Sequence, residues 1–177
     1  MAGLQDASCR LYWIIQDNMA KRDFPTHLVY ARNNLAWGKL AYYLLKVLGV
    51  EIPRSVKIGN NFRLEHGGNG VVIHSKTVIG NNVRIYQGVT IGRSDIHLPA
   101  ENSQFEGIRI EDDVILSPGS KVLCKQGILT MASGSMLGAN AVLFESTGPG
   151  EIWAGIPARC VSTREAKDAQ AQGNQRA

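Results

Sequence analysis

Large aliphatic residues recur at every sixth position through the middle of the chain, with small or polar residues between them. The positions that keep this spacing are Ile52, Ile58, Leu64, Ile73, Ile79, Ile85, Ile91, Ile110, Leu116, Val122, Met131, Leu137 and Leu143. A period of six fits neither a helix nor the two-residue alternation of a half-buried strand. It is typical of a parallel β-helix, in which each short strand and its turn take one hexapeptide and successive coils stack.

The chain divides into three parts around this repeat. Residues 1–50 have the apolar spacing of helices, and we expect them to cap the open end of a solenoid formed by residues 51–161. Residues 162–177 are polar and rich in Ala, Gln and Gly, which predicts a flexible tail. The predicted fold class is therefore mainly β, with a helical cap at its N-terminal end.

Two helices are predicted within the cap. The first begins at Asp6 or Ser8 and ends before Pro25, because proline disfavours the helical conformation of the residue before it. Thr26 is a candidate cap for a second, longer helix, and Gly49 is a suitable residue to end it.

The six-residue period is interrupted in three places. The breaks lie between Leu64 and Ile73, between Ile91 and Ile110, and between Val122 and Met131. The second break contains the loop 93–107, which we expect to leave the coil. Since stacking alone needs no such insertions, these are the places where the chain is expected to build something else.

Composition narrows the function classes. The length of 177 residues suits one domain, and the net charge of +4 suits an anionic small molecule. No run of Lys and Arg with interleaved aromatic residues is present, so we expect no nucleic-acid partner. Cys9, Cys124 and Cys160 are odd in number and lack metal-site spacing, which favours reduced thiols and a cytoplasmic protein. Neither a secretory signal nor a membrane span is expected, because the most apolar stretch, 35–50, is too short and contains lysines.

His66 is the first candidate for chemistry. It lies in the first break of the period, with Gly67, Gly68 and Gly70 close behind it. Glycine-rich backbone allows a substrate to approach closely, and an imidazole there can act as a general base toward a hydroxyl. The alternative is a solvent-facing turn histidine without a role. His27 and His74 lie at regular positions of the cap and of a turn, which favours structural roles.

Several segments together resemble the serine acetyltransferase branch of the hexapeptide-repeat acyltransferases, over roughly residues 50–162. The most specific are the Glu-His pair before Gly70-Val71-Val72 and the closing Ala154-Gly155-Ile156-Pro157-Ala158-Arg159. The repeat indicates only the fold, whereas these two motifs are typical of acyl transfer. The resemblance implies a left-handed β-helix, a homotrimer, acetyl-CoA as co-substrate and no metal.

The resemblance also implies roles for three residues. His66 matches the general base that deprotonates the acceptor hydroxyl for direct attack on the thioester. Glu51 matches the carboxylate that orients this histidine, and Glu65 matches the one that helps to hold the serine substrate. Both positions carry Glu where serine acetyltransferases carry Asp, which puts the geometry of these contacts in question.

The acceptor is the point on which the sequence departs most from serine acetyltransferases. Their large helical N-terminal domain is reduced here to about 50 residues, and their second histidine falls in a loop that is longer here. His97 and Asp95 are the candidates for substrate binding in this loop. These departures favour a sugar hydroxyl of a polysaccharide or glycoconjugate pathway, with L-serine as the alternative acceptor.

Acetyl-CoA is expected to lie along turns of successive coils. The residues that the resemblance suggests for this are Ser117, Gly119, Gly138, Ala139, Arg159 and Arg164. The glycines and Ala139 would offer backbone groups to the pantetheine arm, and the two arginines would meet phosphates. Each arginine has the alternative of being an ordinary solvated charge.

Two further hypotheses belong to other classes. A β-helix without catalytic function can serve as an assembly module, and loss of the histidine would mark one. A carbonic-anhydrase-like metal site would need three histidines, for which His66, His74 and His97 are available. The presence of His66 and the acyltransferase-like ending argue against both.

Overall fold

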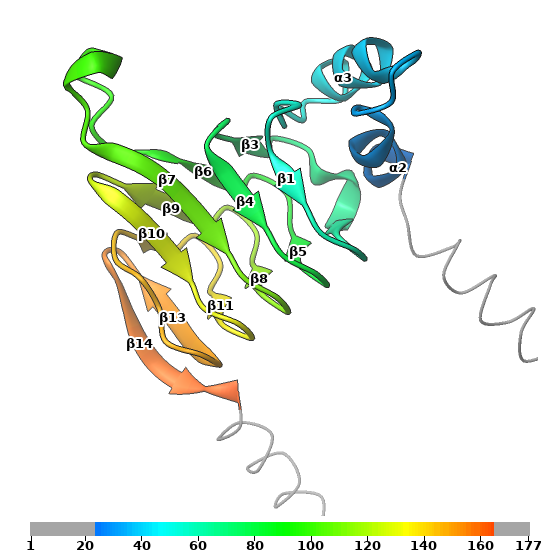
Figure 1. Ribbon diagram of the computed structural model, residues 1–177. Helices are drawn as coiled ribbons and strands as arrows, with labels where there is room; N and C mark the ends of the chain where they lie inside the picture. The colour runs from blue at the N-terminus through cyan, green and yellow to red at the C-terminus, as the bar shows by residue number, and fades with distance from the viewer. Residues whose placement is uncertain (1–23, 165–177) are drawn as a thin grey trace, which may run out of the picture.

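The structure is a computed structural model that describes residues 24–164. The first predicted helix and residues 165–177 of the predicted tail lie outside this range. Within it, three parallel sheets wrap around one core and form a β-helix, with two helices at its N-terminal end (Figure 1). None of the helices between residues 24 and 164 has the length and apolar character needed to cross a bilayer.

We name the three sheets A, B and C. Sheet A consists of β3 (Val72–Ile73), β6 (Thr90–Arg93), β9 (Lys121–Cys124) and β12 (Val142–Leu143). Sheet B consists of β1 (Lys57–Ile58), β4 (Thr77–Ile79), β7 (Phe105–Ile110) and β10 (Gly127–Met131). Sheet C consists of β2 (Arg63–Leu64), β5 (Arg84–Ile85), β8 (Ile115–Leu116), β11 (Met136–Leu137), β13 (Glu151–Gly155) and β14 (Ala158–Thr163).

Each coil takes one strand from sheet B, then one from C, then one from A. The turns between the sheets therefore stack into three edges, which we call the B–C, C–A and A–B edges. Strand β14 differs from the rest because it runs antiparallel to β13 and closes the last coil. It continues through Thr163, two residues beyond the predicted end of the solenoid at 161.

The core confirms the predicted period. Every residue of the six-residue series is buried except Ile58, which is half-buried and packs against the same cluster. Register explains this regularity, because partners such as Leu64, Ile85 and Leu116 occupy equivalent positions in adjacent strands. Burial of a column of aliphatic side chains is the main favourable contribution to such a stack.

The three breaks of the period have different structural outcomes. The first forms a short 3₁₀ segment, η1 (Glu65–Gly68), on the C–A edge. The second forms a loop on the A–B edge that contains η2 (Ala100–Asn102). This loop is shorter than the predicted 93–107, because β6 extends to Arg93 and β7 begins at Phe105. The third break only lengthens β9 and β10.

The described part of the cap contains α2 (Phe24–Ala31) and α3 (Gly38–Val47) instead of one long helix. The prediction that Thr26 caps a helix is wrong, because α2 begins two residues earlier. The Oγ1 atom of Thr26 instead accepts a hydrogen bond from the backbone N–H of Leu64 at 3.0 Å, which joins α2 to β2. Gly49 follows the end of α3 with a φ of 76°, as expected of a residue that ends a helix.

Candidate active site

His66 occupies a backbone conformation that few side chains adopt. Its φ is 54° and its ψ is 36°, and Gly67 follows with a φ of 72°. The left-handed region costs a residue with a Cβ atom roughly 1–2 kcal/mol. The side chain of His66 is nevertheless exposed, so burial does not offset this cost. Strained conformations of this kind gather at functional sites, which supports His66 as a candidate for chemistry.

The C–A edge carries His66 and most of the predicted CoA residues. Successive turns on this edge stack through residues with positive φ, namely Gly70, Gly88, Gly119 and Asn140. Ser117 and Gly119 lie in one of these turns, and Gly138 and Ala139 lie in the next. With about 4.8 Å between neighbouring strands, the turn of Ala139 lies three coils or about 14 Å from that of His66. The structure therefore places these residues on one line, as an extended thiol cofactor requires.

Backbone conformation favours glycine at two turns of this edge. A Cβ atom on Gly88 would make only an ordinary contact, 3.5 Å from the Cα atom of Gly119, but the φ of Gly88 is 72°. A Cβ atom on Gly119 would lie 2.2 Å from Oδ1 of the exposed Asn140 side chain, which would have to move. Glycine at 119 is therefore favoured both by its φ of 70° and by its neighbour. Both glycines are half-buried, and neither places a side chain over its turn.

Tyr86 is a neighbour of His66 that was not predicted. The rings of His66 and Tyr86 are 5.9 Å apart, centroid to centroid, with 49° between their planes. Leu64 and Ile85 are register partners, so the residues directly after the two strands are also neighbours. The six-residue series already aligned Leu64 with Ile85, and this alignment was the signal that could have identified Tyr86.

The two predicted carboxylates lie in different surroundings. Glu65 is half-buried and directly precedes His66 in η1. Glu51 pairs through its backbone with Val72, and its Oε1 atom lies 3.3 Å from Nζ of Lys46 in α3. Hydrogen bonds that Lys46 donates to the Tyr42 side chain and to Glu51 raise the pKa of Lys46. The ion pair with Lys46 thus occupies the carboxylate that was predicted to orient His66, and the orienting role stays a prediction.

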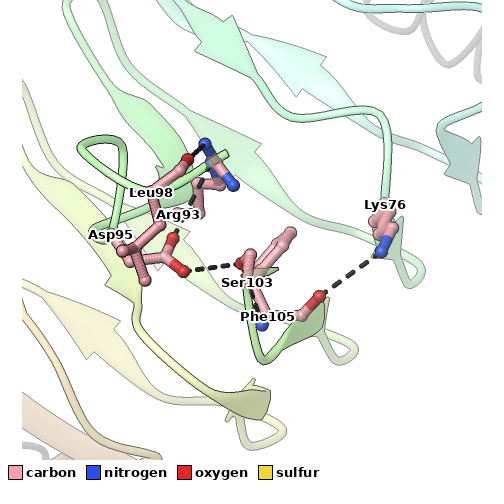
Figure 2. Close-up of polar contacts among 6 residues, drawn as sticks. All are labelled: Lys76, Arg93, Asp95, Leu98, Ser103 and Phe105. Atoms are coloured by element: carbon pink, nitrogen blue, oxygen red, sulfur yellow. Dashed lines mark hydrogen bonds and ion pairs between the residues drawn. The ribbon is translucent and has the colours of Figure 1, made fainter. Parts of the chain in front are cut away.

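A polar network holds the base of the loop on the A–B edge (Figure 2). The side chain of Asp95 is only 2% exposed, and its Oδ2 atom accepts a hydrogen bond of 2.6 Å from Oγ of Ser103. Nε of Arg93 lies 3.7 Å from Oδ1 of Asp95, and Nη2 of Arg93 donates to the carbonyl of Leu98. The bond from Ser103, followed by the charge of Arg93, lowers the pKa of Asp95. In this arrangement the Asp95 carboxylate binds its own loop.

His97 lies in the same loop and is exposed. Its loop leaves the A–B edge, whereas His66 lies on the C–A edge, so one copy of the chain does not bring the two histidines together. His74 is also separate, because its ring packs edge-on against Phe105 with 4.8 Å between the centroids. Residues 24–164 contain no group of three His, Cys, Asp or Glu side chains that is arranged to hold a metal ion.

The two predicted phosphate-binding arginines also lie away from His66. Nη1 of Arg159 forms an ion pair of 2.9 Å with Oε1 of Glu145. Nη1 of Arg164 donates to the backbone carbonyls of Asp113 and Gly134, each at 3.1 Å, on the B–C edge. The structure therefore holds Arg164 on the B–C edge, whereas Arg159 is the register partner of Ala154, which packs against Gly138 at the end of the C–A edge.

Several known proteins similar to this chain are serine acetyltransferases. The serine acetyltransferase of Bacillus subtilis is 31% identical over 163 residues, which cover 82% of this chain and 71% of that enzyme. The serine acetyltransferase of Bacillus licheniformis is 38% identical over 113 residues, or 64% of this chain. The chain spans 48% of the length of that relative. A scan against protein-family models gave no match.

Solved structures agree with these relatives. The serine acetyltransferase of Neisseria gonorrhoeae, solved in complex with serine, aligns with a TM-score of 0.63 and 25% identity over 78% of this chain and 55% of that one. A serine acetyltransferase solved in complex with CoA aligns with a TM-score of 0.61 and 27% identity over 77% of this chain and 55% of that one. The β-helix of these proteins is left-handed, and the predicted handedness is confirmed.

Proposed function

Because the chain belongs to the serine acetyltransferase-like branch of the hexapeptide-repeat acyltransferases, we propose that it transfers an acetyl group from acetyl-CoA to the hydroxyl of L-serine. The similarity to the Bacillus subtilis enzyme over most of both chains is the observation that carries this proposal. It favours L-serine, the alternative acceptor, over the sugar hydroxyl that the sequence departures favour. It also outweighs the enlarged loop, the short helical region and the Glu-for-Asp change at Glu65, which favour a sugar.

His66 would act as the general base. One neutral ring nitrogen takes the proton from the serine Oγ, and that oxygen forms a bond to the thioester carbonyl carbon. The resulting tetrahedral intermediate collapses by breaking the C–S bond, and the proton on His66 passes to the departing CoA sulfur. The products are O-acetylserine and CoA, and His66 is neutral again.

The line of turns on the C–A edge supports acetyl-CoA as the donor. Ser117, Gly119, Gly138 and Ala139 would accompany the pantetheine arm toward His66. Serine carries an ammonium group, for which Glu65 offers a half-buried carboxylate one residue before the base. Glu65 and His66 are consecutive residues of η1, so both groups would reach a small acceptor from one turn.

We further propose that the active enzyme is a trimer with sheet A facing the three-fold axis. Sheet A lies between the C–A edge, which carries His66, and the A–B edge, which carries the His97 loop. In this arrangement the A–B edge of one copy adjoins the C–A edge of the next. The outer surface of sheet A is apolar enough for such contacts, with Val72 and Phe144 exposed and Leu123 and Val142 half-buried. His97 of one copy would then reach the His66 site of its neighbour.

Release of free thiol from acetyl-CoA in the presence of millimolar L-serine tests the proposed reaction. L-Alanine is the matched control acceptor, because it differs only by lacking the hydroxyl that would be acetylated. We expect saturable thiol release with L-serine and none with L-alanine. Saturable turnover of a sugar or nucleotide sugar, without turnover of serine, would overturn the proposal and restore the sugar acceptor.

A further inference from the structure

Three arginines converge on a pocket that the proposed reaction does not use. The pocket has a volume of about 280 Å³ and lies on the B–C edge, away from the two edges that flank sheet A. It is lined by Asn61, Arg63, Asn82, Arg84, Asp113 and Arg164. In a trimer with sheet A at the axis, this edge faces solvent, so the pocket remains accessible.

Two of these arginines are fixed side by side by the β-helix. Arg63 and Arg84 are register partners in β2 and β5, and the residues directly after them point into the core. Both arginines therefore point outward, with about 4.8 Å between their strands. Like charges directly opposite each other on neighbouring strands are destabilising. The register partner of Arg84 on its other side is Ile115, which is neutral. No acidic side chain in this register position therefore offsets the repulsion between Arg63 and Arg84.

The third arginine arrives from the far end of the solenoid. Arg164 directly follows β14, and two hydrogen bonds from its Nη1 atom to the carbonyls of Asp113 and Gly134 hold it against the B–C edge. These bonds use one nitrogen and leave the rest of the guanidinium group available. Asp113 is the acidic residue among the six that line the pocket, so three positive charges face one negative charge.

The neutral part of the lining is also ordered. Asn61 and Asn82 have φ values of 54° and 56°, and Nδ2 of Asn61 donates to Oδ1 of Asn82 at 3.0 Å. That bond leaves the amide group of Asn82 with donors to spare. Within residues 24–164, none of the ion pairs involves Arg63 or Arg84. The pocket thus presents fixed hydrogen-bond donors and uncompensated positive charge.

We infer that this pocket, which we call the triarginine pocket, binds a free tetrahedral oxyanion such as phosphate or sulfate. Guanidinium groups bind such oxyanions through paired N–H donors, and three of them around one small cavity suit an anion with several oxygens. The bound anion would link the first two coils to the end of β14. It would relieve the repulsion between Arg63 and Arg84 and stabilise the closure of the last coil.

The test compares the wild type with Arg84→Ala and Arg109→Ala. Arg109 also points outward from a strand, but it lies in sheet B beside Val78, away from the triarginine pocket. Melting temperature is measured against sodium phosphate, and against sodium chloride at equal ionic strength. We expect phosphate to raise the melting temperature of the wild type and of Arg109→Ala saturably, by roughly 3–6 °C at ten times the dissociation constant. Arg84→Ala should lose this rise.

An equal phosphate-dependent rise in Arg84→Ala would overturn the inference, as would loss of the rise in Arg109→Ala. Calorimetric titration with CoA separates the free anion from a phosphate of the cofactor. We expect the CoA affinity of Arg84→Ala to equal that of the wild type. Weaker binding of CoA to Arg84→Ala, with no binding of inorganic phosphate to the wild type, would assign the pocket to the cofactor and overturn the free-anion site. Neither measurement requires that the proposed acetyl transfer be correct.

Discussion

The ring of Tyr86 lies 5.9 Å from the imidazole of His66, centroid to centroid, in the next coil of the β-helix. The register of β2 on β5 enforces this contact, since Leu64 and Ile85 stack in the core and the residues after them stack on the C–A edge. His66 is exposed and its backbone is strained, and the ring of Tyr86 is a contact that can restrict its orientation. The stack of coils thus positions a side chain that its own turn leaves on the surface.

Removing this ring should therefore impair the enzyme without altering the base itself. Ring pairs contribute about 0.5–1.5 kcal/mol beyond burial, so we expect Tyr86→Ala to lower kcat for serine acetylation by roughly twofold to tenfold. Tyr86→Phe keeps the ring and should stay close to the wild type. Steady-state thiol release measures both. Equal activity of Tyr86→Ala and the wild type would show that the ring does not position His66.

Replacement of His66 should abolish most turnover. Loss of a general base costs about 10²–10⁴-fold, and we expect a drop of this size in kcat for both His66→Ala and His66→Asn. Asparagine tolerates a φ of 54° better than alanine, so His66→Asn separates the lost base from backbone strain. Asn82→Ala is the control for strain, because its φ of 56° is similar and it lies on the B–C edge. Turnover near the wild-type level in His66→Asn would exclude the proposed mechanism.

The oligomer can be tested with two valines of similar exposure. Val72 on the outer face of sheet A is 43% exposed, and Val78 on the outer face of sheet B is 45% exposed. Val72→Glu should disrupt a trimer packed on sheet A, because it places charge at a buried contact, and serine acetylation should fall with it. Val78→Glu should leave both unchanged. Light scattering coupled to size-exclusion chromatography reads the mass, and equal masses for the two variants would argue against sheet A at the axis.

The Asp95–Ser103 hydrogen bond should make the stability of the protein depend on pH in the acidic range. The pKa of Asp95 is lowered in the folded state, so the stabilisation is fully present above the ordinary Asp pKa and is lost as pH falls from there through the lowered pKa of the folded state. We expect Asp95→Asn to be less stable than the wild type at pH 7, and the difference in melting temperature to shrink as pH falls below about 4. Asp112, whose pKa is lowered by hydrogen bonds from Asn81, titrates in both proteins and cancels in this difference. A difference that stays constant from pH 7 to pH 3 would contradict the role of the bond.

Arg32 should be essential for docking the helical cap. Its side chain is 1% exposed and donates to the carbonyls of Val29 and Val56, and burial lowers its pKa to about 10. Arg32→Met would leave these buried carbonyls without a donor, at a cost of about 2–4 kcal/mol in the free energy of unfolding. Arg54→Met, at an exposed position, should cost little. Urea unfolding measures both, and equal stabilities would mean that the cap docks without Arg32.

The sequence by itself determined the solenoid and the side chains that fill it. A column of aliphatic residues at a six-residue spacing can be buried in one way only, with one strand and one turn per hexapeptide, so Ile73, Ile79, Ile85 and Ile91 all reached the core. The sequence also identified His66 as a candidate, because the stacking of coils does not require a glycine-rich insertion in a strict six-residue period. The six-residue period and its first break are both patterns among residues close together in the chain, and such patterns can be recognised without a structure.

The tertiary structure decided which of the predicted site residues meet. Asp95 was a candidate substrate ligand, but its loop folds back so that Ser103 takes its carboxylate. Thr26 is a residue type that often caps helices, but β2 lies close to it, and its hydroxyl oxygen accepts a hydrogen bond from the backbone N–H of Leu64. Arg164 lies 80 residues beyond Arg84 in sequence, and only the return of β14 along the last coil brings it to the same pocket. Such contacts depend on the number of residues in every intervening turn, because each insertion moves the next part of the chain to another edge of the β-helix.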